Sequence, residues 1–189
     1  MGHWDGMNDR QLLRAYVAQH DVQAFDAFVG RHEASLLSFA AAFLRDEATA
    51  QDVVQETFLR AARNPQRVLK HAEQVSGGRN WLLKVVRDLS VDRLRRRAVE
   101  RRVKADVAAA SEKVAPAADA ALHGKEDVAR IQAAIQRLEP RLRELLLLKV
   151  QERRSYREIA QITGLTVTNV GFLLHRAMKT LAAVVKDEP

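Results

Sequence analysis

Between positions 25 and 43, large apolar side chains recur at steps of three and four residues: Phe25, Phe28, Val29, Leu36, Phe39 and Phe43, with His32 on the same face. This spacing places them on one face of an amphipathic helix. The pattern returns at 53–62, 81–94 and 170–181. Aromatic residues are only 5% of the chain, and Ala, Leu and Val dominate, which favours helices over sheets. We therefore expect an all-α fold.

A stretch without an apolar stripe separates two helical regions. Residues 105–121 contain nine Ala and one Pro, which indicates a flexible linker, placed here at 105–126. The linker divides a first domain at 8–104 from a second domain at 127–186, each large enough for a core of its own. We expect the second domain to have four helices. In the first domain, the polar residues 66–78 are expected to form a loop before a helix that begins near Arg79.

The second domain carries a helix, a tight turn and another helix, in the string SYREIAQITGLTVTNVGFLLHRAMKTL at 155–181. Ser155 and Glu158 have the spacing of a capping box, Gly164 suits a left-handed helix stop, and Thr166 can cap the next helix. A helix-turn-helix of this kind presents the start of its second helix to the DNA major groove. An ordinary helical hairpin with a glycine stop has the same local pattern, so both interpretations stay open.

The positive charge of the chain is concentrated in one place. The formal net charge is +7, and between Arg93 and Lys104 seven basic residues stand against one acid, Glu100. This arginine cluster consists of Arg93, Arg95, Arg96, Arg97, Arg101, Arg102 and Lys104. Guanidinium groups on one helix pair well with nucleic-acid phosphates, although a solvated basic face has the same composition. Trp81, near the start of that helix, could stack on an unpaired base, but a core position is favoured.

The string QDVVQETFLRA at 51–61 predicts a helix with one polar face. Asp52, Gln55 and Glu56 share that face by their spacing. Such a face can dock on a basic groove of a partner protein. On composition alone, a merely solvated face is the stronger interpretation.

Five strings in this order resemble one family of proteins. They are AFDAFVGRHEASLLSFA (24–40), QDVVQETFLRA (51–61), NWLLKVVRDLSVDRLRRR (80–97), IQRLEPRLRELLLLK (135–149) and the helix-turn-helix string at 155–181. Each string is moderately specific, whereas their joint order and spacing are highly specific. From about Asn8 to Val185 the chain resembles an extracytoplasmic-function sigma factor of the sigma-70 family.

The resemblance implies a role for each segment. In this family the first domain binds core RNA polymerase, here through Asp52, Gln55 and Glu56, and it opens and reads the minus-ten promoter element. The implied minus-ten residues are Asn80, Trp81, Lys84, Arg87, Asp88, Asp92, Arg93, Arg95, Arg96 and Arg97. The second domain reads the minus-thirty-five element. The residues implied there are Ser155, Arg157, Thr166, Thr168, Asn169, His175, Arg176 and Lys179.

The chain departs from the family pattern just before its Val-Val-Gln-Glu helix. Relatives carry several acids there, whereas this chain has Thr49, Ala50, Gln51 and Asp52. One hypothesis is that phosphorylation of Thr49 restores the missing negative charge, near a helix N-terminus where anions are favoured. The alternative is that Thr49 only caps the helix. The regulatory input is expected from a serine/threonine kinase or from an anti-sigma factor.

Two further departures concern DNA reading. After Val170, where relatives have basic or small polar residues, the chain has Gly171, Phe172 and Leu173. This face either reads an unusual minus-thirty-five sequence or binds a protein. Many relatives carry Asn where this chain has Asp88, and an acid there repels phosphate but can accept a hydrogen bond from cytosine.

Other classes of protein are disfavoured. The chain has no Cys, its six His show no metal-ligand spacing, and it has no phosphate-binding loop or nucleophile elbow. No enzyme activity, cofactor or metal is therefore expected. No apolar run is long enough to span a membrane, and no signal peptide is visible, so we expect a cytoplasmic protein without membrane insertion. Two alternatives remain: a stand-alone helix-turn-helix regulator, and a sigma mimic that titrates regulators.

Overall fold

The computed structural model describes residues 4, 6–73, 77–108 and 133–186. Within these ranges all regular structure is helical, which confirms the all-α prediction. The elements are α1 (Asp9–Gln19), α2 (Val22–Leu44), α3 (Glu47–Arg63), α4 (Pro65–Ala72), α5 (Gly77–Ala108), α7 (Pro140–Val150), α8 (Tyr156–Thr163) and α9 (Val167–Lys186). Residues 133–137 are also helical.

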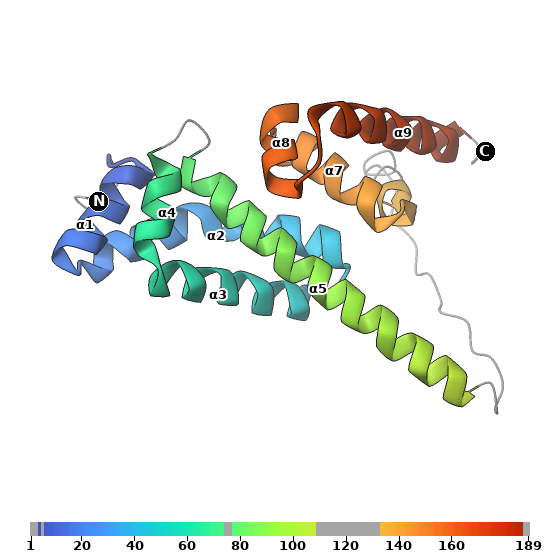
Figure 1. Ribbon diagram of the computed structural model, residues 1–189, viewed down its shortest axis with the longest axis horizontal. Helices are drawn as coiled ribbons and strands as arrows, with labels where there is room; N and C mark the ends of the chain where they lie inside the picture. Colours follow the sequence, from blue (N-terminus) through green and yellow to red (C-terminus); the bar gives the residue numbers. More distant parts are fainter. Residues whose placement is uncertain (1–3, 5, 74–76, 109–132, 187–189) are drawn as a thin grey trace, which may run out of the picture.

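The first domain consists of α1 to α5, and α2 forms its centre. Helices α1, α3 and α5 all pack on α2, and α4 closes the end between α1 and α5 (Figure 1). The apolar stripe of α2 lies in the core as expected, since Phe28, Leu36, Phe39 and Phe43 are buried. His32 is also buried, beside the ring of Phe28, which confirms its interpretation as a core residue.

One element of the first domain differs from the prediction. Residues 66–78 were expected to form a loop, but Pro65 begins a helix, α4, which continues to Ala72. Proline is tolerated in the first turn of a helix because its missing N–H would have no partner there. Val68 packs into the core and holds this short helix in place. Helix α5 begins at Gly77, close to the predicted start.

Helix α5 extends beyond the predicted end of the first domain. It continues to Ala108, and therefore includes the first four residues of the predicted linker. The rest of that linker, from residue 109 to 126, lies outside the described residues, as do residues 127–132 at the start of the predicted second domain. The domain boundaries therefore stay a prediction.

The second domain, as described, consists of residues 133–137 with α7, α8 and α9. Its own small core joins Leu138, Leu142, Leu146 and Ala177. The predicted capping box at the start of α8 is present, because Ser155 accepts from the N–H of Glu158 and Glu158 accepts from the N–H of Ser155. Gly164 ends α8 with φ 72°, in the left-handed region where glycine is favoured.

The two domains pack against each other. Helix α7 lies along α2, and α8 lies against the first half of α5 (Figure 1). Buried apolar residues of both domains belong to one continuous cluster, which includes Leu82 and Val86 from α5 and Leu145, Ile159 and Ile162 from the second domain. In this closed arrangement the second domain covers one face of α5.

Candidate nucleic-acid interface

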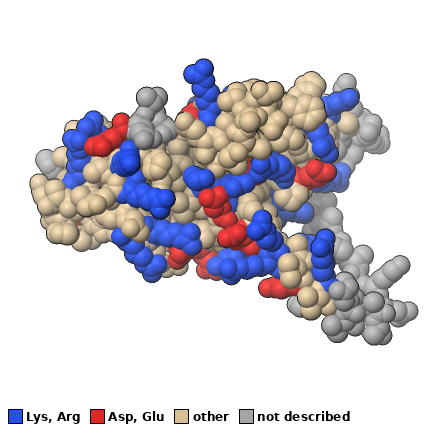
Figure 2. All heavy atoms as spheres, in the orientation of Figure 1, with Lys and Arg blue, Asp and Glu red and all other residues tan. Residues whose placement is uncertain are grey.

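Helix α5 carries the ten residues that the sequence places at the minus-ten element, and eight of them fall into two groups, while Asp88 and Arg97 are half-buried. The first group is accessible: Lys84, Asp92, Arg93, Arg95 and Arg96 are exposed. Figure 2 shows Lys and Arg side chains gathered over α3 and α5, with acidic side chains between them. Asp88, on the same helix, pairs with Arg87 at 2.8 Å and with Lys84 at 3.8 Å. The charge on this face is therefore mixed.

The second group consists of Trp81, which is buried in the core cluster, and of Asn80 and Arg87, which are held by the second domain. Trp81 is 8% exposed and belongs to the core cluster, as the favoured interpretation predicted. Asn80 is also buried, and its side chain is held by Glu158 of α8 and by Arg154, which lies two residues before α8. Its Nδ2 donates to Oε1 of Glu158 at 3.2 Å, and its Oδ1 accepts from Nη1 of Arg154 at 2.9 Å. Asn80 cannot reach DNA while the domains are closed, and Trp81 is part of the core.

Two arginines of α5 fix the closed arrangement by pairing with buried carboxylates of the second domain. Nε of Arg87 donates to Oε1 of Glu144 on α7 at 2.7 Å, and the carboxylate is 1% exposed. Arg79 pairs with Glu152, whose side chain is buried to the same degree. Burial lowers the pKa of Arg87, but its bonds to Asp88 and Glu144 outweigh burial and raise it overall. Arg87 therefore stays charged.

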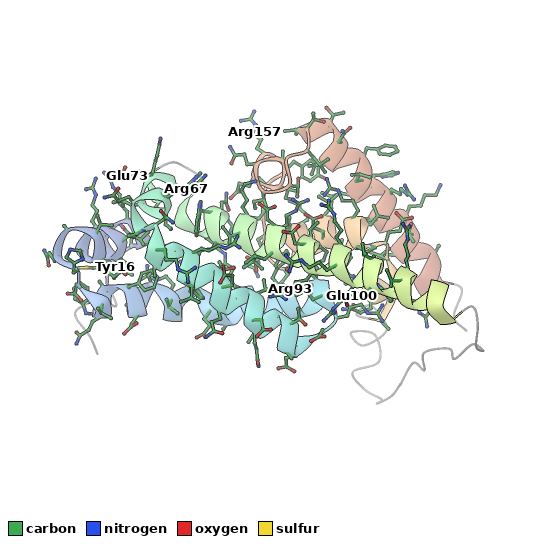
Figure 3. The ribbon with its side chains drawn as sticks, turned by 60° about the horizontal axis from the view of Figure 1, so that its bottom comes forward. Tyr16, Arg67, Glu73, Arg93, Glu100 and Arg157 are labelled. Atoms are coloured by element: carbon green, nitrogen blue, oxygen red, sulfur yellow. The ribbon has the colours of Figure 1, made fainter. Side chains whose placement is uncertain are left out.

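The three residues predicted to bind polymerase lie together on the outer face of α3. Asp52 and Gln55 are exposed, and Glu56 is half-buried and pairs with Arg60 at 2.9 Å. They line one side of an open groove of about 410 Å³, and the opposite side comes from α5 through Leu89, Asp92, Arg93 and Arg96. Figure 3 shows Arg93 on the side of α5 that faces α3. The structure thus brings residues predicted to bind polymerase and residues predicted for the minus-ten element to one groove.

A second groove on α3 was not found from the sequence. It has a volume of about 430 Å³, lies between α2 and α3, and is lined mainly by apolar residues, among them Phe25, Val29, Val54 and Phe58. Gln55 and Leu59 line both this groove and the one beside α5. Leu59 is exposed although it is large and apolar. The sequence did offer one signal for this groove, because Leu59 stands on the face of the 51–61 helix that was predicted to be polar.

Thr49 lies in the first turn of α3 and contacts the arginine cluster. Its N–H donates to Oδ1 of Asp46 at 2.9 Å, and its hydroxyl oxygen accepts from Nη2 of Arg97 at 2.6 Å. The same Arg97 nitrogen donates to Oδ2 of Asp46 at 2.5 Å. The helix cap is therefore Asp46, and the interpretation of Thr49 as the cap is wrong.

The residues predicted for the minus-thirty-five element lie on α8, on α9 and at their N-terminal caps. Thr166 caps α9 by accepting from the N–H of Asn169 at 3.2 Å, as predicted. The predicted readers that are exposed are Ser155, Arg157, Thr166, Thr168, Asn169, His175, Arg176 and Lys179. Figure 3 shows Arg157 on the side of α8 away from α5. Arg176 pairs with Glu139 at 3.4 Å. Phe172 is 67% exposed in the middle of this surface.

Other kinds of site are not seen in the described residues. No group of three or more His, Asp or Glu lies close enough together there to hold a metal ion. Within the same residues, no helix combines the length and the apolar character that a membrane span requires.

Comparison with known proteins identifies the class. Residues 28–100 match the family model for sigma-70 region 2, and residues 129–181 match that for sigma-70, region 4. The first match includes α3 and most of α5, and the second includes the helix-turn-helix. The fold and the two matched regions together define a sigma-70 type of protein.

Individual relatives show which family of sigma-70 proteins the chain resembles. The chain is 30% identical over 171 residues to the ECF RNA polymerase sigma factor SigC of Mycobacterium tuberculosis, covering 90% of this chain and 88% of the relative. The solved structure of CnrH in complex with the cytosolic domain of CnrY is similar, with a TM-score of 0.66 and 25% identity over 96% of this chain and 99% of that one. The sigma factor RpoE in complex with the anti-sigma factor NepR from Bartonella quintana has the same fold, with a TM-score of 0.61, 20% identity, and coverage of 93% and 99%. The chain belongs to the extracytoplasmic-function sigma factors of the sigma-70 family.

Proposed function

We propose that this chain directs core RNA polymerase to specific promoters and starts transcription there, using α3 for the polymerase, α5 for the minus-ten element and α9 for the minus-thirty-five element. The observation that supports this best is that one chain of this family carries both a basic helix and an exposed helix-turn-helix surface. A stand-alone regulator would have no use for the groove between α3 and α5. A cytoplasmic site of action follows from the same proposal.

The polymerase-binding surface is proposed to include more than the predicted polar residues. Asp52, Gln55 and Glu56 supply negative charge and hydrogen bonds, and the adjacent groove between α2 and α3 supplies apolar contact through Phe58 and Leu59. A surface with an apolar centre and a charged rim has the anatomy of a protein–protein interface. The apolar groove also offsets the shortage of acids at positions 49–52.

Promoter reading is proposed to require separation of the two domains. The exposed residues Arg93, Arg95 and Arg96 can contact phosphates in the closed arrangement, whereas Asn80 and Arg87 are held by the second domain. Polymerase can separate the domains if it binds the open form more tightly, because a partner shifts an equilibrium by its difference in affinity for the two forms. Opening would also expose Glu144 and Glu152, which then need water or a new partner.

Regulation by phosphorylation of Thr49 is proposed on the basis of its surroundings. The hydroxyl is already 2.6 Å from Arg97, and arginine binds phosphate through paired, charge-assisted hydrogen bonds. A phosphate would add about −1.5 to −2 charges in the first turn of α3 and displace Asp46 from Arg97. The new charge would lie one turn from the polymerase-binding face. An anti-sigma partner, of the kind bound to RpoE in its solved complex, is the alternative input.

The test is binding of the purified chain to bacterial core RNA polymerase. We compare wild type with Thr49→Glu, and use Thr49→Gln as a neutral control of the same shape. Under phosphorylation control, Thr49→Glu binds at least about tenfold more tightly than Thr49→Gln, which corresponds to about 1.4 kcal/mol. Tight and equal binding by all three forms would reject the phosphorylation proposal and leave the sigma function standing. Failure of every form to bind, and to support transcription from any promoter, would reject the sigma function.

A further inference from the structure

An open groove of about 690 Å³ lies where the two domains meet, and no step of the proposed function uses it. Its walls come from the end of α2, from α5 and from the start of α7. The groove is lined by five arginines, namely Arg45, Arg97, Arg101, Arg137 and Arg143, against two acids, Glu100 and Glu139. Figure 3 labels Glu100, which marks the α5 side of this groove.

Arg143 is the unusual member of this set, because it is 3% exposed. Its Nη1 donates to the backbone oxygen of Gln136 at 3.1 Å, and its Nε is buried without a hydrogen-bond partner. In the part of the chain that the structure describes, no carboxylate pairs with it. Burial and the charge of nearby Arg45 lower the pKa of Arg143. Burying a cation without a counter-ion costs several kcal/mol, so a purely structural role would favour Leu or Met here.

Gln136 supplies a second incomplete group in the same groove. Its Nε2 donates to the backbone oxygen of Ala42 at 3.2 Å, which fixes the orientation of the amide. Its Oε1 is buried and has no partner. The wall of the groove therefore contains an unpaired cationic donor and an unpaired acceptor, and because both atoms are buried, a ligand reaches them only when these two side chains turn toward the groove. A ligand that satisfies both must carry an anionic oxygen and an N–H or O–H group.

The remaining surroundings restrict the size and chemistry of that ligand. The start of α7 lines the groove through Glu139 and Pro140, and a helix N-terminus favours an anion. Two guanidinium groups close together favour a dianion such as a phosphate over a single carboxylate. The apolar part of the wall, made by Leu44, Leu94, Leu138 and Pro140, can cover a flat ring. The volume is within the usual range of about 300–1,000 Å³ for small-molecule sites.

We propose that this groove binds a small phosphorylated molecule of nucleotide size, with its phosphate on Arg143 and Arg45 and a ring amine or hydroxyl on Gln136. Because both domains supply the walls, the bound molecule stabilises the closed arrangement. Binding itself is independent of the proposed function. Only its consequence, a lower fraction of chain available to polymerase and promoter, rests on that function.

The test is calorimetric titration of the purified full-length chain with ATP and GTP, and with adenosine and inorganic pyrophosphate as the two halves of the ligand. A nucleotide is expected to bind one to one and to raise the melting temperature. Wild type is expected to bind adenosine at least about tenfold more weakly than ATP, and Arg143→Met is expected to bind ATP at least about tenfold more weakly than wild type does. In each case a charge-assisted hydrogen bond is missing. Arg67→Met, which removes an equal charge from an exposed site on α4, should leave binding unchanged.

A second variant keeps the proposal testable if Arg143→Met does not fold. Arg45 is exposed and has φ 59°, and Asn tolerates that left-handed conformation, so Arg45→Asn should fold normally and still weaken binding severalfold. Absence of nucleotide binding at millimolar concentration would overturn the proposal. So would equal binding by wild type, Arg143→Met and Arg45→Asn. A short single-stranded oligonucleotide is titrated in parallel; if it binds and ATP and GTP do not, the groove contacts nucleic acid, and the small-ligand proposal is wrong.

Discussion

Arg87 and Glu144 are separated by 57 positions in the chain, yet Nε of Arg87 lies 2.7 Å from Oε1 of Glu144. The pair joins the helix proposed to read the minus-ten element to the first long helix of the second domain. Arg141 also reaches Glu144, at 3.2 Å. Arg87, which is predicted to face the promoter, is therefore one of the side chains that hold the closed form together.

Replacing Arg87 with Met should weaken the contact between the domains. Glu144 then keeps only its 3.2 Å contact with Arg141, which lies in the same domain, so the ion pair between the domains is lost. We expect this to lower the free energy of domain separation by up to about 3 kcal/mol. Hydrogen exchange of the backbone amides along α7 and α8 measures this loss. Lys84→Met removes the same charge from an exposed position on the same helix and should change exchange little. Equal exchange in the two variants would contradict a role for the pair in closure.

The contact at Glu158 should depend on pH. Burial opposes ionisation of Glu158, but hydrogen bonds from Ser155, Asn80 and Arg154 outweigh it and lower its pKa from 4.5 to about 2. The folded pKa is below the unfolded value, so the ionised group stabilises the folded chain above about pH 4.5. That contribution is lost as the pH falls from about 4.5 towards 2.

Urea unfolding of wild type and Glu158→Gln across this range measures the effect. The difference in unfolding free energy between the two proteins should be largest above pH 4.5 and should shrink towards pH 2, because titration of the other acids cancels in the comparison. A difference that stays constant with pH would show that the carboxylate charge is not the source of the stability.

Gly171 is a weak point of α9 that does not serve packing. A Cβ at this position would lie 3.6 Å from the ring of Tyr156, an ordinary contact distance. Gly171→Ala should therefore raise the unfolding free energy by about 1 kcal/mol through helix propensity. Thermal or urea unfolding checks this directly. A loss of stability would mean that α9 needs the flexibility of glycine at this point.

The surface of α9 contains residues of two expected kinds. Asn169 is predicted to contact a base edge, so Asn169→Ala should cost about 1–3 kcal/mol on the preferred promoter and relax its sequence preference. Lys179 is predicted to contact phosphate, so Lys179→Ala should weaken binding to all duplexes alike and reduce the number of counterions released on binding by about one. The affinity of each variant holoenzyme for duplexes with the preferred and with a mutated minus-thirty-five sequence distinguishes the two effects. If neither variant affects DNA binding, this surface, with its exposed Phe172, binds a protein instead.

Features encoded by neighbouring residues were predictable from the sequence. The stripe of α2, the capping box of Ser155 and Glu158, and the stop at Gly164 depend on residues within a few positions of one another. Helix α4 was missed because it is short and buries only Val68 deeply, which is too little for a periodic pattern to show. From the sequence, Thr49 was offered as the cap of α3, but the cap is Asp46, so the predicted start of the helix was wrong by three positions.

Features that depend on distant residues could not be predicted. The sequence shows α5 as a free basic helix, whereas Asn80 and Arg87 are held by residues 57 to 78 positions away. Arg143 stands in a Leu-rich helix, and nothing local shows that its charge is buried beside Arg45. The residues proposed for polymerase and promoter contact were inferred from the resemblance, and they stay predictions.

The central claim is that the second domain covers α5 in the free chain and leaves it when polymerase binds. Because the chain has no Cys, dyes can be attached to Gln66→Cys on α4 and Met178→Cys on α9, both exposed positions, and energy transfer reports the distance between the domains. We predict high transfer in the free chain and a clear fall when core RNA polymerase is added, with a further fall on promoter DNA. Unchanged transfer in a holoenzyme that starts transcription would contradict the account.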